Sequence, residues 1–331
     1  MDSLLMQILP FSLPAIPAVL PYISSGLSKI MATLLEKALS QYFRFCDMSP
    51  CTIDLDGHTT MHFWTTNHQQ FDKPNLVLVH GYGGHSRWQF FRMVRPLSRS
   101  FNLYIPDLVF FGKSNTHRSD RSDVFQARSV GEGLKRLGVG IFSVVGISYG
   151  GWVAYRMAEM YREEVEKVVI VSCGICYEEH QKIEHLRKLG RNPMDVLLPQ
   201  TPDELRFLIN LGFYNCDPLK WVPDFFLGVL INNMCKGRRK EKLELIEHLL
   251  AKKSEPNLSI LFQETLLIWG DQDNIFPLFL AHQLQRHLGP KSKLEIIKDT
   301  GHAVNMESPG PLKDLIKSFV LGCSKYDACI N

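Results

Sequence analysis

The sequence lacks a strong excess of charge of either sign. Lys and Arg number 37 against 34 Asp and Glu in 331 residues, so the formal net charge is only +3. Proteins that bind nucleic acid usually carry a marked basic excess, and the composition therefore indicates no nucleic-acid partner. Hydrophobic residues make up 45% of the chain. That is enough for a large buried core, in one elaborated domain or in a domain with an insertion.

The cysteines lack the regular short spacing of a disulfide-stapled secreted domain. Eight cysteines are spread along the chain, a pattern that favours reduced thiols in a cytosol-facing protein. Cys173 and Cys176 form a Cys-x-x-Cys pair, but no second pair follows at zinc-site spacing. We therefore interpret them as ordinary core or loop cysteines and expect no metal site.

The N-terminal segment lacks an apolar stretch free of helix-breaking residues. Residues 4–23 are strongly apolar but include four prolines, each of which removes a helix hydrogen-bond donor. A continuous membrane-spanning helix is therefore disfavoured, although the length alone would suffice. A signal peptide fits poorly as well, because Asp2 and no Lys or Arg precede the apolar run.

An amphipathic pattern follows these prolines. Apolar residues recur at helical spacing from Leu27 to Leu39, which predicts a helix with one apolar face. Two interpretations stay open: the helix packs on the rest of the protein, or the N-terminal arm, residues 1–45, lies against a membrane surface. We expect a protein that is cytoplasmic or peripherally bound to an intracellular membrane.

The remaining chain divides into two segments of alternating strand and helix patterns, residues 46–176 and 264–331. This alternation predicts an α/β fold with a mostly parallel, doubly wound sheet. Between them, residues 177–263 contain several prolines and no clear parallel-strand pattern. The segment is too long for a plain connection, and we predict an inserted helical cap. Within the first segment, Asp56-Gly57 predicts a hairpin turn between two short strands.

The sequence Gly146-Ile147-Ser148-Tyr149-Gly150 follows the apolar run 142–145 and precedes the helix-like segment 152–161. That order is typical of a nucleophile elbow, a strand-to-helix turn that exposes the serine hydroxyl. Gly146 and Gly150 suit such a turn because a side chain at either position would collide with a neighbouring strand or helix. Three fixed positions recur by chance, so the evidence depends on catalytic partners elsewhere in the chain.

A glycine-rich loop, residues 80–84, follows the predicted strand at residues 76–79. Backbone N–H groups in such a loop can stabilise the negative charge of a tetrahedral intermediate. We predict an oxyanion hole formed by the N–H groups of Tyr82 and Tyr149. His80 is interpreted as a brace for the loop. A phosphate cradle is not supported, because no Gly-Lys-Ser/Thr sequence is present there.

The partners of the serine come late in the chain. A serine hydroxyl needs a neighbouring base to become a nucleophile, and His302 follows a predicted strand as such a base. Asp271 and Asp273 compete for the carboxylate that orients the histidine. We favour Asp273, because it lies further into the loop and can turn back over the sheet, and we expect Asp271 to brace the loop. The order serine, acid, histidine along the chain is found in one of the folds that carry such a triad and differs from the order in the others.

These motifs resemble those of the α/β-hydrolase fold superfamily, from residue 76 to the C-terminus. Residues 198–205 look similar to part of the cap of membrane-associated monoacylglycerol lipases, and residues 106–114 look like the plant branch of such proteins. The resemblance implies an α/β-hydrolase fold with an inserted cap and hydrolysis of carboxylic esters, with acylglycerol-like esters as one option. Water completes such a cycle, and no cofactor is implied. Ser148 argues against the relatives that use an aspartate nucleophile.

Four aromatic residues are candidates for the substrate pocket: Phe110, Phe111, Phe213 and Trp221. Many relatives have glycine where Phe110 stands, so we expect this loop to crowd the pocket mouth differently. Residues 236–242 form a basic cluster, interpreted as a solvated helix start or as a membrane-attracted patch. The function also stays open between an ester hydrolase, a ligand receptor with little turnover, and a lyase or acyltransferase that uses the same triad.

Overall fold

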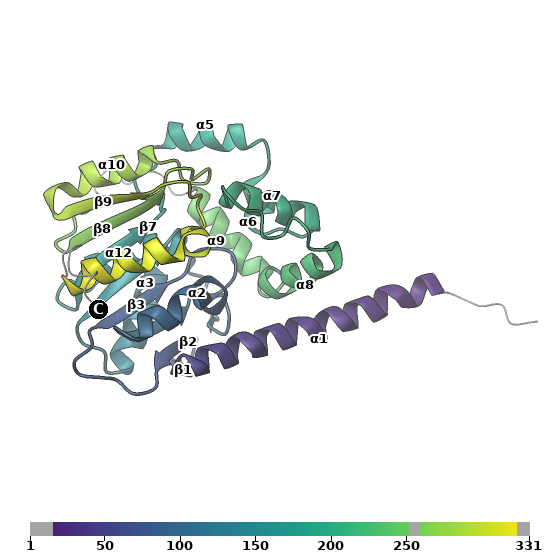
Figure 1. The fold of residues 1–331 in the computed structure, drawn as a ribbon, viewed down its shortest axis with the longest axis horizontal. Helices are drawn as coiled ribbons and strands as arrows, with labels where there is room; N and C mark the ends of the chain where they lie inside the picture. Colours follow the sequence, from purple (N-terminus) through teal and green to yellow (C-terminus); the bar gives the residue numbers. More distant parts are fainter. Residues whose placement is uncertain (1–15, 252–257, 323–331) are drawn as a thin grey trace, which may run out of the picture.

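The computed structural model describes residues 16–251 and 258–322, which form one mixed sheet with helices around it (Figure 1). The strand order is β1-β2-β4-β3-β6-β7-β8-β9, with β5 paired to β2. The strands are β1 Met48–Asp54, β2 Thr59–Thr66, β3 Asn75–Val79, β4 Asn102–Asp107, β5 Asn115–Thr116, β6 Phe142–Ile147, β7 Val165–Val171, β8 Glu264–Gly270 and β9 Ser292–Ile297. From β4 to β9 all neighbouring strands run parallel, and the predicted mostly parallel sheet is confirmed.

The antiparallel part lies at one edge of the sheet. β1 pairs with β2 from Met48↔Thr66 to Asp54↔Thr60, so the turn encloses Asp56-Gly57 as predicted. Gly57 has φ +75° and donates its N–H to Asp54 Oδ1 at 2.8 Å. Glycine reaches such a φ without a steric penalty, which explains why the hairpin turns here. The two-residue strand β5 was not predicted, because it is too short to leave a periodic pattern.

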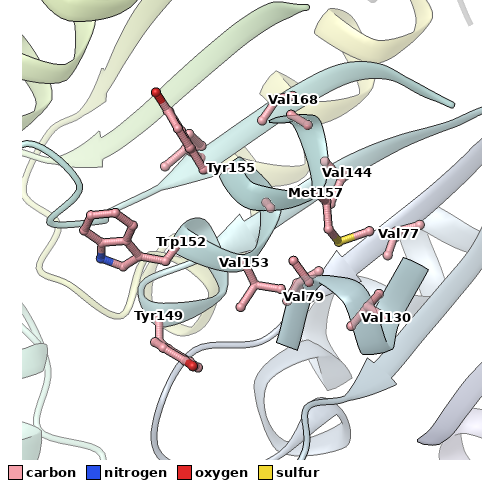
Figure 2. Close-up of a cluster of buried hydrophobic side chains, with 14 of the residues drawn as sticks. Val77, Val79, Val130, Val144, Tyr149, Trp152, Val153, Tyr155, Met157 and Val168 are labelled. Atoms are coloured by element: carbon pink, nitrogen blue, oxygen red, sulfur yellow. The ribbon is translucent and has the colours of Figure 1, made fainter. Parts of the chain in front are cut away.

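Helices cover both faces of the sheet because side chains alternate along each strand. Leu76 and Leu78 of β3 enter one apolar cluster with helices α2 (Ser86–Ser98) and α12 (Pro309–Leu321). Val77 and Val79 of the same strand enter a second cluster with α3 (Asp123–Arg136), α4 (Tyr149–Met160) and α10 (Phe279–Leu288). Figure 2 shows part of the second cluster, where residues of α4 lie against valines of the sheet.

The segment between β7 and β8 is helical. Its helices are α5 Glu179–Leu189, α6 Pro193–Leu197, α7 Pro202–Gly212, α8 Asp224–Met234 and α9 Arg239–Ala251. Pro193 and Pro202 stand at the first helical position, where the missing N–H has no helix partner. Helices α6 to α9 share a small apolar core of their own, and Figure 1 shows α6, α7 and α8 gathered to one side of the sheet. The exact boundaries 177 and 263 for this cap stay a prediction.

Helix α1, Ile16–Phe45, begins earlier than the sequence pattern suggested. Pro17 lies in its first turn, where a proline costs little, and Pro21 lies further inside. Phe43, near the C-terminal end of the helix, is fully buried beside α2 and β2 and anchors it. From there toward its N-terminal end, the helix passes α8 and extends away from the sheet (Figure 1). Within the described ranges, no helix has both the length and the apolar character needed to cross a membrane.

Candidate active site

Ser148 stands between β6 and α4 in a strained backbone conformation. Its φ of 54° and ψ of −120° lie in a region that non-glycine residues rarely adopt, and its N–H is held by the carbonyl of Val171 at 2.8 Å. A Cβ on Gly146 would lie 2.1 Å from Gly150 O, and one on Gly150 would lie 2.3 Å from Val79 O. The two glycines are therefore required by the close approach of β6, α4 and β3.

Three polar side chains meet above the carboxyl ends of the parallel strands. His302 Nε2 lies 3.0 Å from Ser148 Oγ, and His302 Nδ1 lies 2.9 Å from Asp273 Oδ2. An ionised carboxylate can only accept hydrogen bonds, so Nδ1 carries the proton and Nε2 is left to accept from the serine hydroxyl. The geometry is that of a nucleophile, a general base and an orienting carboxylate.

The two aspartates that follow β8 have separate positions. Asp273 is 5% exposed, and its second oxygen accepts the N–H groups of Ile275 at 2.9 Å and Phe276 at 2.7 Å. These two bonds fix the carboxylate toward His302. Asp271 instead accepts a hydrogen bond from the N–H of Thr300 at 3.3 Å. It joins the two loops that carry the aspartate and the histidine, and so it braces them.

The loop after β3 approaches the serine closely. A Cβ on Gly81 would lie 2.9 Å from Ser148 Cβ, so glycine lets the backbone reach the nucleophile. Among the described residues, no acceptor is bound by the N–H of Tyr82 or by the N–H of Tyr149. Both groups are therefore available to a developing oxyanion.

Gln89 of α2 holds this loop from below. Its Oε1 accepts the N–H of Gly81 at 2.7 Å, and its Nε2 donates to the carbonyls of Gly81 at 3.1 Å and Gly83 at 2.8 Å. This role of Gln89 was not predicted from the sequence. The sequence pattern that could have indicated it is a glutamine in the first turns of the helix that follows a glycine-rich loop.

His80 is a second brace of the loop. Its Nε2 accepts the N–H of Leu108 at 2.9 Å, and its Nδ1 donates to the carbonyl of Gly81 at 2.8 Å. Complete burial lowers the pKa of His80 from 6.5 to about 4, because a charged imidazole is poorly solvated there. The ring is therefore neutral at pH 7 and ties the loop after β3 to the loop after β4.

The similarity of most of this chain to known proteins agrees with this geometry. Residues 74–309 match the family model described as the alpha/beta hydrolase fold. The chain belongs to this family. The human monoacylglycerol lipase ABHD6 is 26% identical over 269 residues, which are 77% of this chain and 77% of that protein. The Xenopus laevis monoacylglycerol lipase abhd6-B is 25% identical over 278 residues, 80% of each chain.

Solved structures of α/β hydrolases show the same fold. A bacterial membrane phospholipase A superposes with a TM-score of 0.76 at 20% identity, covering 92% of this chain and 96% of that one. The carboxylesterase CesB of Bacillus subtilis superposes with a TM-score of 0.63 at 18% identity, covering 88% and 98%. At these identities the likeness establishes the fold. The named relatives of this α/β hydrolase are lipases and esterases.

The four aromatic pocket candidates of this α/β hydrolase lie in different environments. Phe110 and Phe111 are each 1% exposed. The ring of Phe111 packs edge-on against His80 and Tyr82, with ring centroids 5.2 Å and 5.3 Å apart, so it supports the oxyanion loop. Phe213 ends α7 beside the histidine loop, because a Cβ on Gly301 would lie 3.1 Å from Phe213 C. Trp221 is 87% exposed, outside any enclosed pocket.

Phe110 has a left-handed backbone, with φ +76°. A non-glycine residue in this region costs roughly 1–2 kcal/mol, whereas deleting a buried phenylalanine side chain costs about 3–5 kcal/mol. The ring enters the core, and Arg121 stacks on it at 4.4 Å. Burial therefore outweighs the strain. The ring of Phe110 is turned into the core, and the expectation that this loop crowds the pocket mouth differently stays a prediction.

Proposed function

We propose that this protein is a serine ester hydrolase that acts through an acyl-enzyme. The observation that supports it best is the position of His302, within hydrogen-bond distance of both Ser148 Oγ and Asp273 Oδ2. The strained backbone of Ser148 and the free N–H groups of Tyr82 and Tyr149 add the two other features that acyl transfer requires.

The reaction begins with the serine. Ser148 Oγ attacks the ester carbonyl carbon while its proton passes to His302 Nε2, and the carbonyl oxygen becomes an oxyanion held by the N–H groups of Tyr82 and Tyr149. Collapse of this intermediate breaks the bond to the alcohol, which takes the proton from His302. Asp273 stabilises the positive imidazolium between these two transfers.

Water then completes the cycle. It loses a proton to His302 Nε2 and attacks the acyl carbon, and the second tetrahedral intermediate releases the carboxylic acid as the proton returns to Ser148 Oγ. Every step uses side chains and backbone groups of this chain.

For the substrate we propose a small to medium apolar ester, with a monoacylglycerol as one member of the class. The support is the name of the animal relatives, monoacylglycerol lipase, together with a cap that exposes large apolar side chains such as Tyr214, Trp221 and Phe226. The loop at residues 106–114 supports placing the chain in the plant branch of such proteins.

For the N-terminal arm we propose peripheral contact with a membrane surface. On the described part of α1, Ile30 is 58% exposed and Leu34 is 59% exposed, one turn apart on the same side. Such a pair gains free energy when it leaves water for the lipid interface. A different side of the helix is engaged with the protein through Glu36 and Ser40.

The proposed function is tested by a fluorophosphonate probe combined with steady-state turnover. The panel comprises monoacylglycerols, fatty-acid methyl esters and short aryl esters. We expect labelling of Ser148 and many turnovers per molecule on at least one apolar ester. Labelling with a single turnover would instead identify a receptor. Transfer of the acyl group to an acceptor other than water would identify an acyltransferase. Bond cleavage that does not consume water would identify a lyase.

A further inference from the structure

A polar cavity lies between α1, the start of α2, the loop after β4 and the link from α8 to α9. Its volume is about 210 Å³, and its wall combines segments that are far apart in the sequence. Titratable side chains supply much of that wall: Glu36, His85, Arg87, Lys113, Arg238 and Lys242. The catalytic triad contributes none of the cavity's lining residues.

The cavity wall holds more positive than negative charge. Arg87, Lys113, Arg238 and Lys242 carry four cations, and Glu36 is the single carboxylate in the lining. That carboxylate is already used by Arg87, whose Nη2 lies 2.5 Å from Glu36 Oε2. For the other three cations, no carboxylate of the described residues lies within ion-pair distance, although Glu241 is near enough to interact with Arg238 and Lys242.

Of these three cations, Lys242 is the most deeply buried, and it is only 5% exposed. Within the described residues its Nζ donates one hydrogen bond, to the carbonyl of Met234 at 2.9 Å, and it lies 5.2 Å from the centroid of the Phe111 ring. Burial, with Arg238 and Arg239 nearby, lowers the pKa of Lys242 to about 8. A buried ammonium with one neutral acceptor is costly, and an anion beside it would relieve that cost.

Arg238 is held in place by neutral carbonyls, and the carboxylates of Glu241 and Asp107 act on its charge without forming an ion pair with it. Its Nη1 donates to the carbonyls of Gly112 at 3.3 Å and Ser114 at 3.0 Å, and its backbone has φ +51°. The nearest buried carboxylate, Asp107, is already bound by His62, by Ser86 and by the N–H of Lys113. The side chain of Lys113 is exposed and makes no hydrogen bond to a described residue.

Two buried nitrogen atoms in the wall also lack partners in the described chain. They are His85 Nδ1 and Arg87 Nε, in residues 7% and 6% exposed. Buried polar atoms are nearly always hydrogen-bonded, but these two have almost no accessible surface, so they add to the polar character of the wall while its cations are what indicate a ligand. The other nitrogen of His85 lies 3.1 Å from Glu36 Oε1, which also accepts from Trp88 and Asn233.

We propose that this cavity is a binding site for a phosphate group, carried by a lipid headgroup or present as free phosphate. A tetrahedral dianion offers several oxygens to the arginine and lysine donors and compensates the surplus charge of the wall. The proposal stands independently of the ester hydrolase activity, because it uses none of the proposed catalytic groups.

The site is joined to the oxyanion loop. Gly84 belongs to the cavity wall and comes two residues after Tyr82. The hydroxyl of Tyr82 donates to the carbonyl of Lys242 at 3.0 Å. A phosphate that draws α9 and the loop together therefore acts on the segment that presents the proposed oxyanion N–H of Tyr82.

The first experiment measures binding of inorganic phosphate to the full chain by isothermal titration calorimetry. We expect binding that weakens roughly tenfold in Arg238→Gln and in Lys113→Gln, because each loses a charge-assisted contact. Lys113 is exposed, so its variant guards against a folding defect. Lys240→Gln is the matched control, since this side chain is 87% exposed and lies outside the cavity, and its affinity should equal that of the unsubstituted protein.

Glu36→Gln provides a test of the opposite sign. Removing the only carboxylate of the wall should strengthen phosphate binding, because repulsion is lost and Arg87 is released. The same measurements are repeated with phosphatidylcholine vesicles that contain or lack phosphatidic acid. Binding of free phosphate alone supports a phosphate ion as the natural ligand, and vesicle binding that needs phosphatidic acid and Arg238 supports a lipid headgroup. No binding of either probe, or an equal loss in Lys240→Gln, overturns the proposal.

Discussion

Nδ1 of His302 lies 2.9 Å from Oδ2 of Asp273, although the two residues come from loops after different strands. The aspartate is buried and held by two backbone N–H groups, so it cannot rotate away without losing them. This contact fixes which imidazole nitrogen carries the proton, and it leaves Nε2 aimed at the serine hydroxyl.

Asp273→Asn should lower kcat by roughly 10⁴-fold, because an amide in this position favours the wrong tautomer of the histidine. Asp271→Asn is the matched control. It lies two residues away and, among the described residues, accepts one loop hydrogen bond, so its kcat should stay within about tenfold of the unsubstituted protein. Steady-state hydrolysis of a short p-nitrophenyl ester measures both. Equal losses in the two variants would contradict the assignment of Asp273.

Gln89→Leu should reduce kcat more than it changes KM. The leucine keeps the size of the side chain but removes all three hydrogen bonds to the loop that carries Tyr82. Loss of an oxyanion donor costs about 10²–10³-fold in kcat, and a donor that is loosened should cost part of that, on the order of tenfold. Steady-state kinetics and a thermal unfolding midpoint are measured together. A lower midpoint with unchanged kcat would show a purely structural role.

Much of the fold and of the triad could be predicted because the signals are local. A strand pattern, a glycine-bounded serine and a following helix stand side by side in the sequence, and parallel strands bring their carboxyl ends to one edge. Ser148 and His302 are 154 positions apart, yet both follow strands of the same parallel sheet. The topology therefore brings them together without any signal between them.

Contacts between separate elements left no such signal. Glu36 accepts hydrogen bonds from residues 49, 52 and 197 positions away, and no periodicity points to them. The orientation of Phe110 was also hidden, since a positive φ at a phenylalanine contradicts the local preference and is stabilised by burial of the ring in the core.

The stability of the protein should fall as the pH drops from 6.5 toward 4, partly because of His80. Its pKa is 6.5 in the unfolded chain and about 4 in the folded protein, so in this window the unfolded state binds a proton that the folded state does not. Stability then rises with pH, and this group changes the free energy of unfolding by on the order of 3 kcal/mol across the window.

Denaturant unfolding of His80→Gln and of the unsubstituted protein across this pH range measures that contribution. The variant should be less stable at pH 7, because the brace between two loops is weakened, but its stability should depend less on pH. Other groups titrate equally in both proteins and cancel in the comparison. Parallel stability profiles would contradict a neutral, buried His80.

Ile30→Gln combined with Leu34→Gln should reduce binding to phospholipid vesicles while leaving hydrolysis of a soluble aryl ester unchanged. Each side chain is more than half exposed, so the substitutions remove apolar contact with lipid without emptying the core. Deleting residues 1–40 is a poorer test, because it also removes Glu36 and its ion pair with Arg87. Vesicle sedimentation measures the binding, and unchanged sedimentation of the double variant would refute membrane contact through this face.

The most direct test of the proposed function is the turnover of a short p-nitrophenyl ester by Ser148→Ala. The substitution removes the nucleophile but leaves Asp273 and His302 paired. Alanine tolerates the φ of 54° at this position as well as serine does. We predict that turnover falls by roughly 10⁶-fold, to the background left by binding and the oxyanion N–H groups. Unchanged activity in the pure, folded variant would contradict a serine hydrolase.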